Sequence, residues 1–134
     1  MREILFRGKR VDNGEWVYGA YGNHTSFDAM IIDRPYLTGN SDLSALNFWM
    51  VNPATVGQYT GLTDKNGTKI FEGDILSERP SMNNEPYIGY VKYDEELTAY
   101  RIIFKDQSIV HILGSYSTSY TVIGNIHDNP ELLK

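Results

Sequence analysis

The feature that most constrains this chain is a period-two pattern of apolar and polar residues, broken at short intervals by glycine and proline. The side chains of Tyr100, Ile102 and Phe104 share one face, opposite Arg101. Successive side chains of a strand point to opposite faces, so this pattern is typical of an antiparallel sheet with one face on a core. We therefore expect a mainly β fold. The predicted strands span 2–7, 15–21, 28–33, 48–51, 69–71, 74–78, 87–94, 98–105, 108–113 and 120–127.

Turn residues separate these segments. Asn13-Gly14 lies between two apolar runs, and the pair predicts a type I′ hairpin with positive φ at both residues. Asn66-Gly67 repeats the signal later in the chain.

Helix signals are few, and we expect at most one or two short helical turns. Asn52-Pro53 and Asn129-Pro130 each place a capping residue before a proline suited to the first helical position. The stretch before Asn52 stays open: Asn40 or Ser41 can cap a short helix, whereas Phe48–Val51 fits a strand equally well.

Composition limits the classes of protein that this chain can belong to. Its 134 residues suit one domain, and we predict a single domain over residues 1–134. The chain has no cysteine, which excludes disulfides, thiol catalysis and cysteine-based metal sites, and favours a cytoplasmic location. The net charge is −5, opposite to the charge that favours nucleic-acid binding, and we expect no membrane association.

No catalytic or metal-binding motif is found in the sequence. The three histidines, His24, His111 and His127, show no helical ligand spacing, and each is predicted to be structural. His111 is expected on a strand, facing solvent or a partner. A calcium loop starting at Asp64 fails, because its sixth and twelfth positions hold Lys69 and Ile75. We predict no catalytic residue, no cofactor and no metal site.

Three blocks carry a resemblance to a known family. They are Met1–Gly8 continuing to Gly14–Gly19, then Val56–Gly67 with Ile70–Ile75, and finally Tyr120–Leu133. Together they resemble the YopX family of phage and prophage proteins. The resemblance implies a small SH3-like β-barrel with additional strands, a bacterial host cytoplasm and a possible homo-oligomer, but no established activity.

The motif residues also have physical interpretations of their own. Glycines in these blocks suit positive φ or close backbone approach, and Asp64 and Asp74 are expected to accept backbone N–H groups in tight turns. Tyr59 and Ile75 are expected to face the core. We predict a structural role for the whole set: Gly57, Tyr59, Gly61, Asp64, Gly67, Glu72, Gly73, Asp74, Gly124, Asn129 and Pro130.

Three hypotheses for function remain. The first is a non-enzymatic, phage-encoded accessory protein that binds an unknown phage or host protein or assembles with itself, since tyrosine and tryptophan are favoured at interfaces; Trp16 and Trp49 are its first candidates. The second is a nucleic-acid-binding barrel, disfavoured by the net charge, which would use the basic residues of the N-terminal segment. These are Arg2, Arg7, Lys9 and Arg10. The third is an enzyme acting on a small molecule, which the missing catalytic motif makes the weakest.

Overall fold

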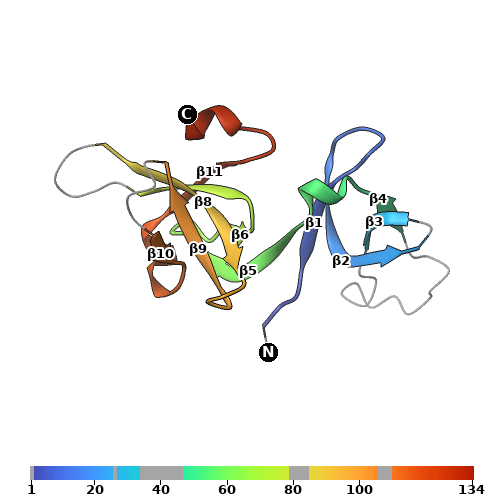
Figure 1. Cartoon of the computed structure of the whole chain (residues 1–134), viewed down its shortest axis with the longest axis horizontal. Coiled ribbons are helices and arrows are strands. Elements are labelled where there is room, and N and C mark those ends of the chain that lie inside the picture. Colours follow the sequence, from blue (N-terminus) through green and yellow to red (C-terminus); the bar gives the residue numbers. More distant parts are fainter. Residues whose placement is uncertain (1, 26, 34–46, 79–84, 106–109) are drawn as a thin grey trace. The chain divides into compact units, whose positions relative to one another are not determined.

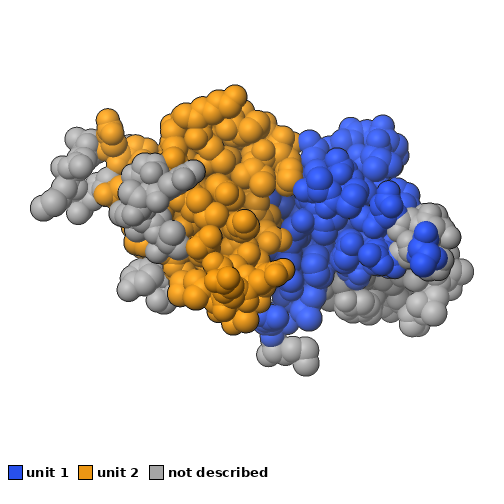
Figure 2. All heavy atoms as spheres, in the orientation of Figure 1, with its two compact units in different colours: residues 1–59 blue, residues 60–134 orange. Residues whose placement is uncertain are grey.

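A computed structural model describes residues 2–25, 27–33, 47–78, 85–105 and 110–134 (Figure 1). It divides into two compact units, residues 1–59 and residues 60–134 (Figure 2). The prediction of a single domain over the whole chain stays a prediction. None of the helices in the described ranges is long and apolar enough to cross a membrane.

The described residues of the first unit form strands and one short 3₁₀ helix. Its elements are β1 (Phe6–Lys9), β2 (Trp16–His24), β3 (Phe27–Ile32), β4 (Phe48–Met50), η3 (Pro53–Thr55) and the first residues of β5 (Gly57–Thr63). The strands pair antiparallel in the order β4-β3-β2-β1-β5. Ala29, Ile31 and Val51 are buried at the centre of this unit, and Trp49 packs against them. The strand alternative for Phe48–Val51 is thus confirmed over Phe48–Met50, whereas Asn40 and Ser41 lie outside the described residues.

The second unit has a separate core and the remaining strands. Its elements are β6 (Lys69–Phe71), β7 (Asp74–Glu78), β8 (Tyr87–Asp94), β9 (Ala99–Phe104), β10 (Val110–Ile112), η4 (Ser115–Ser119), β11 (Thr121–Asn125) and η5 (Pro130–Leu133). Five of its strands form an antiparallel sheet in the order β10-β9-β8-β7-β11, and β6 hydrogen-bonds to β5. The buried core residues are Ile70, Leu76, Val91, Ile102, Phe104, Leu113 and Tyr120.

The two units repeat one topology without an evident sequence repeat. In the described part of each unit, four strands follow one another as a meander, a 3₁₀ helix comes next, and a fifth strand pairs with the first. In the first unit an isolated bridge between Arg10 and Val51 also joins the end of β1 to the residue after β4. The mainly β prediction is confirmed. Within the described residues neither sheet closes, so the SH3-like barrel stays a prediction.

Three expectations for local structure were wrong. β5 was not predicted as a strand, because Gly57 and Gly61 interrupt its side-chain pattern and Gly61 adopts φ +88°. β1 begins at Phe6, later than the expected strand over 2–7. Among the described residues a further 3₁₀ helix, Ser115–Ser119, adds to the two expected after Asn52 and Asn129. No side-chain cap at its start could have indicated it.

The Asn-Gly turns also differ from the predicted type I′ geometry. Only the glycines, Gly14 (φ 72°) and Gly67 (φ 83°), have positive φ. The Arg10 N–H bonds to the Glu15 carbonyl at 2.9 Å, which leaves four residues in the first loop instead of two. A turn of this length needs only one left-handed residue, and glycine supplies it.

Candidate interaction surface

The family-motif residue Asp64 joins the β5–β6 turn to β11. Its Oδ1 accepts the N–H groups of Asn66 (2.8 Å) and Thr68 (2.9 Å), and its Oδ2 accepts the N–H of Val122 at 2.9 Å. The side chain is buried, with 3% exposed. Burial alone would raise the pKa of this carboxyl, but the three backbone N–H bonds, with help from Lys65, outweigh it and lower the pKa below 3.8. The charged Asp64 carboxylate therefore holds three main-chain N–H groups in place.

Asp74 acts in a similar way at the β6–β7 turn. Its Oδ2 accepts the N–H of Phe71 at 2.8 Å, and the side chain is 2% exposed. The preceding Gly73 adopts φ 91°, donates its N–H to the Val91 carbonyl and accepts the N–H of Ile126. These hydrogen bonds connect the β6–β7 turn to β8 and to the residue that follows β11. Both aspartates thus accept backbone N–H groups, as expected.

The rest of the motif lies at similar junctions. An added Cβ at Gly124 would lie 2.5 Å from Oδ1 of Asn129, which explains the glycine there. The same Oδ1 accepts the Asn125 N–H at 3.3 Å, and Pro130 opens η5. Tyr59 faces the core, as does Ile75. The other motif positions are three glycines and a glutamate. Gly57 pairs with β1, and Gly61 and Gly67 adopt positive φ. Glu72 lies in a turn, and its side chain accepts the Tyr93 N–H.

The basic N-terminal residues are not gathered into one exposed patch. Arg7 is only 6% exposed, and its guanidinium carbon lies 4.7 Å from the centre of the Trp16 ring. The Lys9 ammonium lies 5.7 Å from the same ring. These are cation–π distances, so both side chains contact an aromatic residue of the same unit. Arg2 is exposed.

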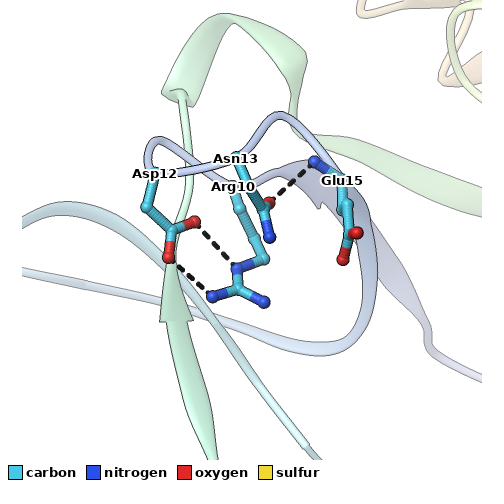
Figure 3. Close-up of polar contacts among 4 residues, drawn as sticks. All are labelled: Arg10, Asp12, Asn13 and Glu15. Carbon is cyan, nitrogen blue, oxygen red and sulfur yellow. Dashed lines mark hydrogen bonds and ion pairs between the residues drawn. The ribbon is translucent and has the colours of Figure 1, made fainter.

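Arg10 is bound to Asp12 within the loop between β1 and β2 (Figure 3). Its Nε donates to Oδ1 at 2.9 Å and its Nη2 to Oδ2 at 2.6 Å, a bidentate pair. The pair raises the pKa of Arg10 and lowers the pKa of Asp12, chiefly through these side-chain hydrogen bonds. In the same loop Oδ1 of Asn13 accepts the Glu15 N–H at 3.0 Å.

A small pocket lies between this loop and β4. It has a volume of about 220 Å³, and its lining consists of Arg10, Val11, Asp12, Phe48, Trp49 and Met50. Two apolar side chains at the pocket are largely exposed: Val11 at 65% and Phe48 at 57%. We call the six lining residues together the Val11–Phe48 surface. Exposed apolar side chains beside a concavity make this surface a candidate interaction site.

The sequence singled out only part of this surface. Trp49 and Arg10 were candidates, although Arg10 was chosen for contacts with phosphate. Val11, Asp12, Phe48 and Met50 were missed as surface residues. One signal was available: Val11 is an apolar residue in an otherwise polar turn.

The histidines lie on separate elements. His111 is exposed on β10, as expected, and its ring lies 5.4 Å from Phe104. His24 ends β2, and His127 lies in the turn after β11. Among the described residues no group of three or more His, Asp or Glu side chains is placed to hold a metal ion.

The comparisons with known proteins concern family and fold. The model of the YopX protein family matches residues 5–134. No curated protein matches the sequence. The crystal structure of protein EF1440 from Enterococcus faecalis is similar over 100% of both chains, with a TM-score of 0.58 and 22% identity, a likeness of fold alone. Because the family match covers nearly the whole chain, this protein belongs to the YopX family.

Proposed function

We propose that this protein is a non-enzymatic accessory protein that binds another protein through the Val11–Phe48 surface. The observation that carries the proposal is the exposure of Val11 (65%) and Phe48 (57%) around a pocket of about 220 Å³. Apolar and aromatic side chains around a small concavity are the usual anchors of protein interfaces. The pocket is smaller than the roughly 300–1,000 Å³ typical of small-molecule sites, which favours a protein ligand over a metabolite.

The contacts of the basic residues count against the nucleic-acid alternative. Binding to phosphate groups needs cations that are free to meet them. Arg7 is buried against Trp16, Lys9 approaches the same ring, and Arg10 already binds a carboxylate in a bidentate pair. The family-motif carboxylates Asp64 and Asp74 hold main-chain N–H groups, which counts against their use in acid–base catalysis.

The fold part of the proposal is that each unit is an SH3-like barrel. Its support is the repeated order of a four-stranded meander, a 3₁₀ helix and a fifth strand that pairs with the first. Membership of the YopX family supports a phage or prophage origin and a role in the cytoplasm of a bacterial host. Self-assembly is the second form of the same proposal, with a second copy as the bound protein.

An affinity experiment with matched variants tests this function. Tagged protein is used to capture partners from host lysate, with and without nuclease treatment, next to the double variant Val11→Ser/Phe48→Ser and the control Leu97→Ser. Leu97 is a fair control because it is also an exposed apolar loop residue, at 50%. We expect a protein that is captured by the wild type and the control but not by the double variant. A partner captured equally by all three, or only without nuclease, contradicts the proposal.

A further inference from the structure

One edge of β4 is used by β3, and the alternation of the backbone identifies the groups on the other edge. The Asn47 carbonyl accepts the Asp33 N–H at 2.8 Å, and the Val51 N–H donates to the Ala29 carbonyl at 3.2 Å. In an antiparallel pair, neighbouring residues direct their N–H and C=O groups to opposite sides. The main-chain groups of Phe48 therefore point away from β3.

The loop after β1 occupies only part of this outer edge. The Asn52 N–H donates to the Lys9 carbonyl at 2.9 Å, and the Val11 N–H donates to the Met50 carbonyl at 3.0 Å. The chain then turns back toward Glu15 and leaves the edge. Among the described residues, no hydrogen bond reaches the outward N–H and C=O groups of Phe48.

The pocket lies at the place where the loop leaves the strand. It is lined by β4 residues on one side and by Arg10, Val11 and Asp12 on the other. Its volume of about 220 Å³ suits one large apolar side chain. Because the two charged side chains that line it already neutralise each other in a bidentate pair, a charged ligand group gains little there.

We propose that the open edge of β4 at Phe48 binds an extended segment of a partner protein as an added strand, with one uncharged apolar side chain in the pocket beside Val11. Main-chain hydrogen bonds to an exposed strand edge, together with a pocket for alternate side chains, are the two parts of recognition by strand addition. This inference rests on the proposed function and states the chemistry of the bound partner.

The test starts from a display library of random linear peptides selected on the full-length protein. We expect selected peptides to share an uncharged apolar residue and to lose binding to the double variant Val11→Ser/Phe48→Ser but not to Leu97→Ser. A selected peptide is then resynthesised with one backbone N-methyl group at each position in turn. Strand addition predicts a loss of at least about fivefold in affinity at the one position whose N–H pairs with the Phe48 carbonyl. It predicts no such loss at the two neighbouring positions, because their N–H groups point away from the edge.

This scan needs no change in the protein, so a misfolded variant cannot obscure the result. Equal losses at neighbouring positions, or no loss at any position, overturn strand addition, and so does a selection without peptides that depend on Val11 and Phe48. The two proposals fail in distinguishable ways. If the affinity experiment finds a partner that needs Val11 and Phe48 but no linear peptide does, the proposed function stands and strand addition is wrong.

Discussion

Replacing Asp64 by asparagine tests the claim that a single carboxylate joins the β5–β6 turn to β11. The side chain is 3% exposed and accepts three backbone N–H groups: two at Oδ1, from Asn66 and Thr68, and one at Oδ2, from Val122. An amide has only one oxygen. We expect the substituted side chain to keep that oxygen toward Asn66 and Thr68, which places its NH₂ group against the Val122 N–H.

The magnitude follows from the bonds lost. An orphaned buried N–H costs about 1–3 kcal/mol, and a hydrogen bond to a charged group is worth about 1.5–3 kcal/mol against about 1 kcal/mol for a neutral one. Asp64→Asn loses the Val122 bond and weakens the other two, so we expect a destabilisation of about 2–4 kcal/mol at neutral pH. Urea unfolding followed by tryptophan fluorescence measures this value.

The pH dependence gives an independent check. The folded pKa of Asp64 is lowered below 3.8, so its contribution is fully present above that pH and is lost as the pH falls through the folded pKa. The difference in stability between wild type and Asp64→Asn should therefore shrink in acid. The exposed carboxylate Asp12 supplies the control, and Asp12→Asn should leave the urea midpoint unchanged.

Hydrogen exchange separates this mechanism from a general loss of stability. In Asp64→Asn the Val122 amide should lose more protection than the amides of Asn66 and Thr68. The reasoning is refuted if the three amides change equally, or if the variant costs no more than Asp12→Asn.

Three further predictions concern stability. Thr98 adopts φ 49°, which costs a β-branched residue about 1–2 kcal/mol. Thr98→Gly removes this cost, but glycine also makes the unfolded chain more flexible, which cancels part of the gain. The variant should therefore be more stable by about 0.5–1 kcal/mol in urea unfolding. Burial, and after it Glu78, raises the pKa of Tyr120 to about 12, whereas the unfolded pKa is 10.0. The free energy of unfolding should therefore fall as the pH rises from 10.0 to about 12. Tyr120→Phe should lose less stability over this range. Gly124→Ala should lower stability by about 1–3 kcal/mol in the same assay, because its Cβ would lie 2.5 Å from a side-chain oxygen.

Local chemistry explains which elements were predictable. The strands over 69–71, 74–78 and 87–94 were predicted with the bounds that the structure has, because turn residues flank them and their side chains fit a strand. The 3₁₀ helices at Pro53 and Pro130 follow from proline's fixed φ and its missing N–H. β5 was missed because its glycines remove the side chains by which a strand is recognised.

The candidate surface was less predictable than the fold. Arg10 was expected to be available for phosphate, but Asp12, two residues away, binds it in the loop. Arg7 was assigned to the same patch from its charge alone, although its strand position places it against Trp16. Charge counted along a sequence does not show which cations are already paired.

The sequence by itself determined the β character, the turn positions and the acceptor role of Asp64 and Asp74, because each depends on residues within a few positions of one another. Only the tertiary structure decided that Asp64 reaches Val122, 58 residues away, and that the loop after β1 leaves β4 at Val11. Both depend on strand pairing between distant segments, where register is set by how whole faces are buried. The open edge at Phe48 is a consequence of that pairing, and no sequence pattern near Phe48 predicts it.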